Sequence, residues 1–335
     1  MVVAECSHDA ARSHTYARRF VFPFVSAPTR QVWTALGVVY FVWGSTYLGI
    51  KVVVDTLPPL FSAGSRFLAA GAILTLVLVL RRTSLRITRR ELLSSALVGT
   101  LLLTTGVGIV HVAELRIDSS VAAMIAGTVP LQVVLLRTAA RERVPRSMRL
   151  ATLVGLAGLM FVLVPGFDAG STAVGLLVMV GASVSWSLGS FLSPRLTLPR
   201  DPFVASAYEM AVGGSLLFVA SLAVGEWGDL DRDAFASDSV AAWVYLVVAG
   251  SLVGFTAYAW LLRAAPISLV VTHQYVNPLV AIALGMLVLG ERPNPLALAG
   301  AALVVGAVYA TVRAESPRRD RAGASLGPEP APKRV

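Results

Sequence analysis

Charged residues are scarce in this chain. Only 14% of its 335 residues are Asp, Glu, Lys or Arg, whereas 56% are hydrophobic and the mean hydropathy is +0.74. A soluble protein of this length would carry roughly a quarter charged residues. The residues outside the apolar runs form a tail at each end and loops of a few residues, which leaves no room for a separate soluble domain. The composition therefore predicts a polytopic membrane protein.

Cysteine and histidine are also scarce. Cys6 is the only cysteine and falls in the N-terminal tail, so we expect no intramolecular disulfide and no cysteine-based metal site. The four histidines are His8, His14, His111 and His273, two in the tail and one in each half. No HExxH, GxSxG, CxxC or P-loop pattern occurs. We therefore expect no catalytic residues, no metal or other cofactor and no ATP-driven pump, so that transport must draw on gradients.

The net charge of +9 is compatible in principle with nucleic-acid binding, but the arginines lie between apolar runs and in the tails rather than on one amphipathic face. Residues 1–30 do not resemble a cleaved signal peptide, because their charges are scattered and Pro23 interrupts their one short apolar stretch. The expected partners are the lipid bilayer, a small-molecule substrate and a coupling proton, with no nucleic acid. The sequence does not specify an oligomeric state.

Ten apolar runs predict transmembrane helices, since a bilayer core of about 30 Å takes roughly 20 residues of helix. They cover residues 32–54, 59–80, 92–112, 119–139, 150–165, 173–192, 203–224, 239–262, 268–289 and 296–312. The predicted fold class is therefore an all-α membrane protein of ten helices. Residues 1–31 form an N-terminal tail, and residues 313–335, rich in Pro, Gly, Ala and charge, form a disordered C-terminal tail.

Arginine placement predicts the orientation, because cytoplasmic loops retain positive charge. If the N-terminus is cytoplasmic, most arginines fall in the inner segments. The outer loops then hold an acidic run made of Glu226, Asp229, Asp231, Asp233 and Asp238. We expect a location in the cytoplasmic membrane with both termini inside, which requires an even number of spans.

The two halves of the chain share a spacing pattern. Pro59 is followed after seven residues by Arg66, and Pro202 is followed at the same offset by Glu209. Later in each half, Pro130 leads to a Glu-Arg pair at 142–143 and Pro278 leads to a Glu-Arg pair at 291–292. Five spans per half is an odd number, so the second half must enter the membrane from the opposite side. The pattern predicts inverted repeats at residues 32–165 and 173–312, an arrangement that produces alternating access.

Several stretches resemble EamA-type members of the drug/metabolite transporter superfamily. They are VWGSTYLGIK (42–51), PPLFSAGSRFLAAG (58–71), SWSLGSFLSPRLTLP (185–199), AYEMAVGG (207–214), YVNPLVAIALGMLVLGER (275–292) and the weaker copy AAMIAGTVPLQVVLLRTAARER (122–143). The resemblance spans residues 32–312. It implies a ten-helix carrier of small metabolites, commonly an exporter of amino acids or related compounds. The sequence departs from the family pattern at three places. Ala140-Arg141-Glu142 stands where Gly-Glu is usual, Arg137 interrupts the end of the fourth span, and His111 stands where a small polar residue is expected. The alternative function is an efflux carrier for lipophilic cationic drugs.

Arg66 and Glu209 are the leading candidate site residues. A charge at mid-helix costs about 2.5–3.5 kcal/mol on insertion scales, so each needs a partner or an aqueous cavity. In the functional interpretation Arg66 binds a substrate carboxylate, while Glu209 recognises an amine or carries a proton. A zwitterion would satisfy both, whereas a cation carrier should depend on Glu209 and be indifferent to Arg66. The alternative is that both are structural ions.

Aromatic and amide side chains supply further candidates for substrate binding. Trp43 and Tyr47 share one face of the first span, with Trp186 and Tyr258 in the second half. For each of these, core packing is an equal alternative. The ninth span is polar ahead of its proline, which makes Gln274 and Asn277 candidates as well.

Pro130 and Pro278 are candidate hinges, because proline frees a backbone carbonyl one turn back; a locally satisfied kink is the alternative. His111 and Glu114, at i and i+3, are candidates for a proton-linked gate, since histidine titrates near physiological pH. For this pair we prefer a simple exposed interfacial location.

Overall fold

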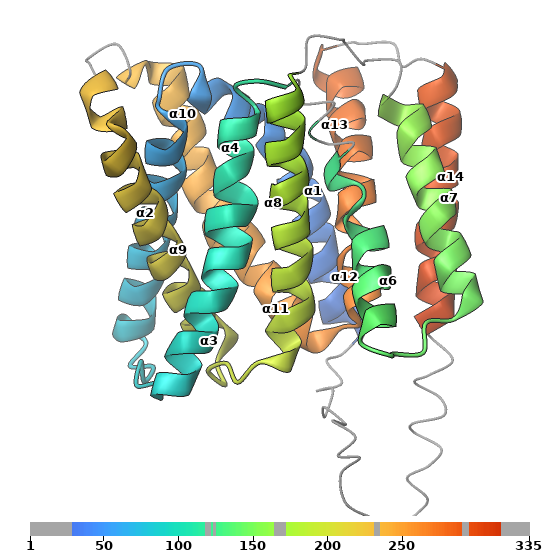
Figure 1. The fold of residues 1–335 in the computed structure, drawn as a ribbon, viewed down its shortest axis with the longest axis horizontal. Coiled ribbons are helices and arrows are strands. Elements are labelled where there is room, and N and C mark those ends of the chain that lie inside the picture. The colour runs from blue at the N-terminus through green and yellow to red at the C-terminus, as the bar shows by residue number, and fades with distance from the viewer. Residues whose placement is uncertain are drawn as a thin grey trace, which may run out of the picture.

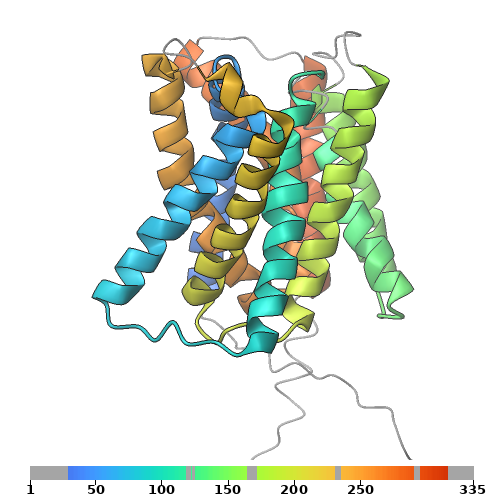
Figure 2. The ribbon, with the colours of Figure 1, turned by 60° about the vertical axis from the view of Figure 1, so that its left-hand side comes forward.

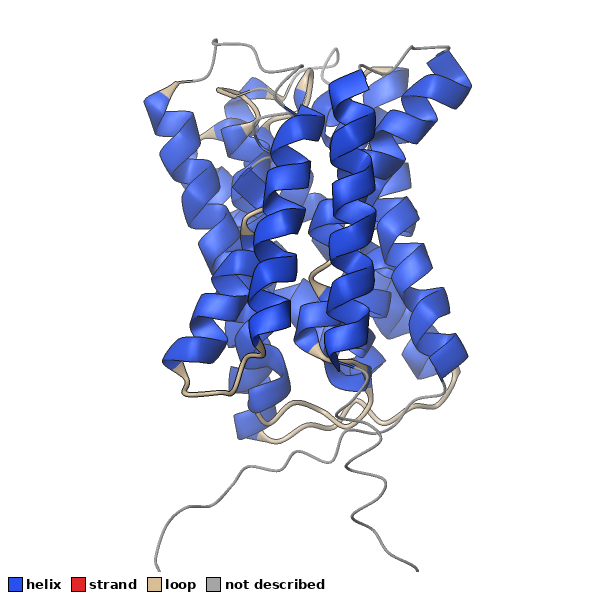
Figure 3. Cartoon of the chain, turned by 90° about the vertical axis from the view of Figure 1, so that its right-hand side faces the viewer, coloured by secondary structure: helices blue, strands red, loops and turns tan. Residues whose placement is uncertain are grey.

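The computed structural model describes residues 29–117, 122, 125–163, 172–230, 235–289 and 295–315. Within these ranges the regular elements are all helices, which run along a common axis as one bundle (Figure 3). The predicted all-α class is confirmed. The acidic residues at 231 and 233, the Glu-Arg pair at 291–292 and almost all of both predicted tails lie outside the described residues.

The elements that form the bundle follow the predicted runs closely. They are α1 (Thr29–Val54), α2 (Pro59–Leu80), α3 (Arg89–Gly99), η1 (Thr100–Gly108), α4 (Ile109–Ala113), α6 (Val129–Ala139), α7 (Arg146–Leu163), α8 (Ala173–Leu192), α9 (Pro202–Val224), α10 (Ser237–Tyr245), η6 (Leu246–Phe255), α11 (Thr256–Ala264), α12 (Ile267–Val270), α13 (His273–Leu289) and α14 (Pro295–Glu315).

Within the described ranges, six helices are long and apolar enough to cross a membrane. They cover Arg30–Val54, Pro59–Leu80, Arg89–Ala113, Ala173–Arg195, Pro202–Val224 and Ser237–Ala264. These correspond to the first, second, third, sixth, seventh and eighth predicted spans. Two further apolar helices in the described chain are shorter. Val129–Ala139 falls within the fourth predicted span, and Leu298–Ala314 overlaps the tenth and extends two residues beyond its predicted end at 312.

Local sequence signals set several helix ends. Pro59 and Pro202 occupy the first turn of their helices, where a missing N–H costs no hydrogen bond. Thr88 caps α3 by accepting a hydrogen bond from the backbone N–H of Glu91 at 3.2 Å, and the Glu91 carboxylate accepts one from the backbone N–H of Thr88 at 2.7 Å. Gly225 ends α9 at φ 86°, a left-handed conformation that glycine adopts without strain.

Glycines allow two helix pairs to pack closely. Helix α2 lies along α9, where a Cβ at Gly64 would come within 2.7 Å of the Phe218 backbone nitrogen. Helix α7 lies along α14 (Figure 1), where a Cβ at Gly300 would come within 2.5 Å of the Gly158 carbonyl oxygen. Small residues at such positions bring two backbones together, which is the principal means of helix association in lipid.

Four helices depart from regular α-geometry. The segments η1 and η6 are π-helical and lie within the third and eighth predicted spans. A turn at residues 127–128 precedes α6, and a second turn at 271–272 separates α12 from α13. Pro130 therefore lies in the first turn of α6, directly after an interruption. Helix α13 continues through Pro278, and its interruption lies six residues earlier.

The two ends of the bundle differ in charge. Helix α1 begins and α14 ends at the same end, the lower end in Figures 1 and 2. The described arginines cluster there, at helix termini and in loops: Arg81, Arg82, Arg89, Arg90, Arg141, Arg143, Arg146, Arg149, Arg195, Arg200, Arg263 and Arg313. We call this the arginine-rich end. The opposite end, here called the acidic end, carries Asp55, Glu226, Asp229 and Asp238.

Candidate functional site

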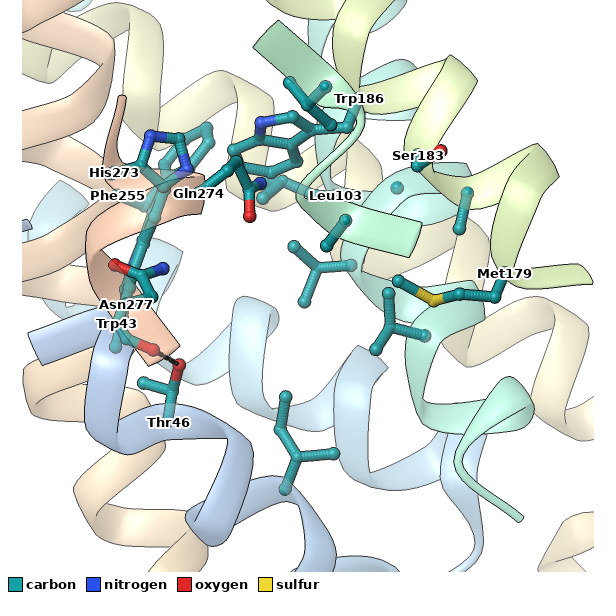
Figure 4. A pocket seen from close by; sticks show the side chains of 18 of the residues that line it. Trp43, Thr46, Leu103, Met179, Ser183, Trp186, Phe255, His273, Gln274 and Asn277 are labelled. Atoms are coloured by element: carbon teal, nitrogen blue, oxygen red, sulfur yellow. Dashed lines mark hydrogen bonds between the residues drawn. The ribbon is translucent and has the colours of Figure 1, made fainter. Parts of the chain in front are cut away.

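A central cavity lies between the two halves of the chain. It contains about 720 Å³ of empty space, its open mouth included. Helices α1 and α2 and segment η1 line it from the first half, and α8, η6 and α13 line it from the second. Figure 4 shows Trp43, His273, Gln274 and Asn277 on one side and Met179 with Ser183 across from them.

The lining residues fall in the half of the bundle nearer the acidic end. Helix α1 begins at the arginine-rich end, and its lining residues start at Trp43 and continue to Ile50. Helix α8 runs in the opposite direction, and its lining residues stop at Trp186. Beyond these limits α1 contributes Leu36 and Val39 to the packed core, both fully buried. The cavity therefore approaches the acidic end, while packed side chains separate it from the arginine-rich end.

Four rings pack together at the floor of the cavity: Trp43, Trp186 and His273 line it, and Tyr258 lies behind them, in contact with all three. The ring centroids of Trp43 and Trp186 are 5.4 Å apart, and Tyr258 lies 5.0 Å from the first and 5.1 Å from the second. His273 lies 5.2 Å from Tyr258. The Trp43 indole N–H donates to the Gly250 carbonyl at 3.1 Å, and Tyr258 hydrogen-bonds with Ser190 at 2.6 Å. The first of these bonds joins the two halves of the chain, and the second joins α8 to α11 within the second half. We call the four rings the aromatic floor.

Arg66 is the charged residue on the cavity wall. Its side chain is buried, with 4% of the residue exposed, and its Nε donates to the Ser251 hydroxyl at 2.9 Å. Among the residues that the structure describes, its Nη1 has no hydrogen-bond partner and no carboxylate forms an ion pair with it. An unpaired buried guanidinium is energetically costly, so this arrangement favours the binding of an anion in the cavity.

Two amides supply neutral polar groups to the same cavity. Gln274 and Asn277 are both buried on α13, and both line the wall. Within the described part of the chain, the side-chain oxygen of Asn277 has no hydrogen-bond donor. Such an oxygen accepts an N–H or O–H from a bound molecule, since an unsatisfied buried acceptor costs about 1–3 kcal/mol.

Glu209 lies outside the cavity. It is buried, with 1% exposed, on a part of α9 whose backbone packs against Gly99. The described residues provide no hydrogen-bond donor for one of its carboxylate oxygens and no ion pair between it and Arg66. The structure therefore places these two predicted site residues apart, one on the cavity wall and one behind it.

His111 and Glu114 are both buried, with 0% and 2% exposed, so our preference for an exposed interfacial pair is wrong. They are buried because α4 packs against both α2 and α8. His111 Nδ1 lies 3.3 Å from the Ser62 hydroxyl, and neither Glu114 oxygen has a partner among the described residues. Of the remaining predicted site residues, Tyr47 lies on α1 with its side chain outside the description.

A charged cluster closes the arginine-rich end. Arg137 Nε donates to Glu142 at 2.9 Å, and Arg195 forms a second ion pair with the same carboxylate. Arg137 also hydrogen-bonds to Ser268, which ties α6 to α12, and Arg195 lies 3.6 Å from the centre of the Phe191 ring. Burial raises the pKa of Glu142, but the hydrogen bonds from Arg137 and Arg195 outweigh it and hold that pKa below its ordinary value of 4.5.

Several cavity residues were absent from the predicted set. They are Thr46, Met179, Ser183 and His273 on the wall and Ser251 behind Arg66. Helical spacing from Trp43 would have identified Thr46, and spacing back from Trp186 would have identified Ser183 and Met179, because residues three, four or seven apart share a helix face.

Two segments of the chain, residues 32–164 and 173–313, match the EamA-like transporter family. The chain belongs to this family. It is therefore a membrane transporter and not an enzyme, as the sequence predicted. It is 36% identical over 278 residues to "Uncharacterized inner membrane transporter YedA" of Escherichia coli (strain K12), covering 82% of this chain and 88% of that protein.

Two more distant similarities agree with this membership. "Uncharacterized transporter YoaV" of Bacillus subtilis (strain 168) is 25% identical over 284 residues, 81% of this chain and 93% of that protein. A crystal structure with 19% sequence identity superposes with a TM-score of 0.67, covering 84% of this chain and 96% of its own. At this level of sequence identity, the crystal structure shows a shared fold alone.

Proposed function

We propose that this protein is a secondary transporter that exports small metabolites, such as amino acids or related compounds, across the cytoplasmic membrane by alternating access. The proposal rests on one observation. The cavity between the halves lies toward the acidic end, and it is closed toward the arginine-rich end by the aromatic floor and by the Arg137–Glu142–Arg195 cluster. A site closed on one side is what alternating access requires of each end state.

The orientation follows from the charges. Cytoplasmic loops retain arginine, so the arginine-rich end faces the cytoplasm, with both chain termini on that side. The relative from Escherichia coli is named an inner membrane transporter, which supports the same location. In this orientation the structure represents the outward-facing state.

The proposed architecture is ten spans arranged as inverted repeats at residues 32–165 and 173–312. Both segments match the same family, which supports a duplication. The close pairs α2–α9 and α7–α14 join the second span to the seventh and the fifth to the tenth, which are equivalent positions in two five-span units. The π-helical segments η1 and η6 also lie in equivalent third positions, and the interruptions at 127–128 and 271–272 lie in equivalent fourth positions.

Each predicted site residue has a proposed role. Arg66 binds a carboxylate, while the rings and amides shape the cavity around the rest of the substrate. Trp43, Trp186, Gln274 and Asn277 of the wall are proposed for this role, together with the predicted residues Tyr47 and Tyr258. Pro130 and Pro278 are proposed hinges beside the interrupted helices. The candidates for proton coupling are Glu209, His111 and Glu114, which are buried carboxylates and an imidazole of the kind that forms relays in transporters.

The alternative function is efflux of lipophilic cations. The aromatic floor favours it, because the faces of Trp and Tyr attract cations within about 6 Å of the ring centre. Buried Glu209 and Glu114 would then supply negative charge. Arg66 on the wall argues against it, since a cation would meet a fixed positive charge in the cavity.

The test is solute counterflow into proteoliposomes that contain the purified protein. A panel of amino acids and one lipophilic cation such as tetraphenylphosphonium would be compared for wild type, Arg66→Gln and Glu209→Gln. We expect counterflow of at least one carboxylate solute, and its loss in Arg66→Gln. Cation counterflow that needs Glu209 but not Arg66 would establish the alternative. Unchanged carboxylate transport in both variants would overturn the proposed site.

A further inference from the structure

The charges on the cavity wall are unbalanced. Among the described lining residues Arg66 is the only one with a formal charge, and none is an aspartate or a glutamate. His273 donates from Nδ1 to the Val270 carbonyl at 2.9 Å, and a histidine ring supplies no negative charge in either of its ordinary protonation states. Gln274, Asn277 and Ser183 are neutral. The described wall therefore presents one positive charge and no negative charge.

Neither nearby carboxylate compensates Arg66. Glu209 lies behind the wall, and Glu114 lies close to the acidic end of α4. No ion pair joins either of them to Arg66 in the described ranges. The guanidinium donates from Nε to the neutral Ser251 hydroxyl and lies 4.8 Å from the centre of the Phe67 ring. Neither contact supplies a negative charge, and Nη1 has no hydrogen-bond partner among the described residues. A carboxylate fits a guanidinium because its two oxygens accept parallel hydrogen bonds.

An ammonium group would find no comparable partner. It would lose its water on entering the cavity and would face Arg66 at short range, where low dielectric strengthens the repulsion. The unpartnered oxygen of Asn277 can accept one N–H or O–H, which suits an amide or a hydroxyl group. This acceptor is neutral and does not offset an ammonium charge.

The rest of the wall is apolar. The lining includes Trp43, Phe67, Phe255, Trp186 and Met179, together with Leu103 and Val107 from η1. Figure 4 shows Asn277 and Gln274 on one side of the cavity, with Met179 and Ser183 on the opposite side. The Ser183 hydroxyl already hydrogen-bonds to Gln132 and to the Val180 carbonyl, so the unpartnered amide oxygen of Asn277 lies on the first side. A bound molecule with one polar end and one apolar body matches this division.

We infer that the cavity selects amphiphilic monocarboxylates without an ammonium group, such as N-acylated amino acids or arylalkyl carboxylates, over zwitterionic amino acids and over cations. The inference rests on the proposed function, because it takes this cavity as the transport site. It narrows "amino acids or related compounds" to solutes with a net charge of minus one at neutral pH.

Three probes of matched shape test the inference: N-acetyl-phenylalanine, phenylalanine and phenylalanine methyl ester. At about pH 6, below the pKa of the ester's amino group, they carry charges of −1, 0 and +1. Their affinities for the full-length protein in nanodiscs would be measured by quenching of tryptophan fluorescence. We expect N-acetyl-phenylalanine to bind at least about tenfold more tightly than phenylalanine, because both carry the carboxylate but phenylalanine must also bring an ammonium group close to Arg66 and remove it from water. The ester, which lacks the carboxylate, should bind most weakly. Equal affinities, or tightest binding of phenylalanine or the ester, would overturn the inference.

Variants separate the charge of Arg66 from a general effect on folding. Arg66→Gln should abolish the preference for the anion, whereas Arg66→Lys should retain its direction. Arg116→Gln removes an exposed arginine close to the acidic end and should leave the order of affinities unchanged. Monodisperse elution and an unchanged Tm identify folded variants. If Arg66→Gln does not fold, loss of the anion preference in Arg66→Lys would count against the inference.

Counterflow of the same three probes distinguishes the inference from the proposed function. Counterflow of phenylalanine in preference to the N-acetyl compound would support transport and overturn the charge selection. Binding in the expected order, with no counterflow of any probe, would support charge selection by the cavity and count against transport.

Discussion

The two ends of the bundle differ in how their charged side chains are paired. Toward the acidic end, Arg66 lies on a cavity wall without a carboxylate partner among the described residues. Toward the arginine-rich end, Arg137 and Arg195 share the carboxylate of Glu142. The difference distinguishes a charge that is available to a ligand from charges that hold helices together.

The largest effect is expected at Arg66. Arg66→Gln should reduce carboxylate transport about 10- to 100-fold, because a hydrogen bond to a charged group contributes about 1.5–3 kcal/mol and each 1.4 kcal/mol is tenfold. Stability should not fall, since the substitution removes an uncompensated buried charge. Initial rates in proteoliposomes measure carboxylate transport, and Tm measures stability. A lower Tm with an unchanged rate would contradict the contrast between an arginine available to a ligand and arginines that hold helices together.

The next effect is expected in the charged cluster. Glu142→Gln should lower stability by about 1 kcal/mol, a modest value because the carboxylate is 33% exposed and water screens its ion pairs. It should also populate the inward-facing state, because Arg137 and Arg195 then lose their shared anion. The Tm measures the first change. The second is measured by labelling from the cytoplasmic side of a single thiol introduced on the cavity wall by Cys6→Ser with Ser183→Cys. Arg313→Gln is the matched control, since Arg313 is exposed at the same end.

A smaller effect is expected from the aromatic floor. In Gly254→Ala the new Cβ would lie 2.4 Å from the Trp43 indole nitrogen, so the ring must move and lose its bond to Gly250. We expect a several-fold fall in affinity, because one neutral hydrogen bond contributes about 1 kcal/mol. Gly181→Ala is the control, since no described atom lies within 4 Å of a Cβ there. Equal effects of the two substitutions would argue against the floor as part of the site.

The smallest effect is a pH dependence. The pKa of Glu142 lies below 4.5 in the folded protein, so the carboxylate contributes stability above that value and loses it as pH falls through the folded-state pKa. The difference in Tm between wild type and Glu142→Gln should be constant from about pH 8 to 5.5 and should shrink below about pH 4.5. A difference that grows on acidification would contradict the ion pairs of this cluster.

Much of the fold could be predicted from the sequence. Apolar runs bounded by Pro59 and Pro202 gave the starts of α2 and α9 to within a residue, because these prolines fit only the first turn. The π-helical segments and the turns at 127–128 and 271–272 could not be predicted, because they depend on how neighbouring helices satisfy the backbone.

The candidate site was predictable only in part. The depth of Arg66 and Glu209 follows from their positions in an apolar run, but the direction in which each side chain points does not. Helix α9 is apolar on most of its faces, so no amphipathic pattern shows that Glu209 lies behind the wall. The burial of His111 and Glu114 likewise depends on α2 and α8, which lie far from them in sequence.

Thiol accessibility tests the central claim, an alternating-access cavity that is closed toward the cytoplasm, most directly. Cys6 is the only native cysteine, so Cys6→Ser with Ser183→Cys places a single thiol on the cavity wall. A membrane-impermeant maleimide would be applied to right-side-out and to inside-out vesicles, with and without a transported solute. We predict labelling from the outside, slowed by the solute. Labelling from the cytoplasmic side alone, or labelling that the solute does not change, would contradict the account.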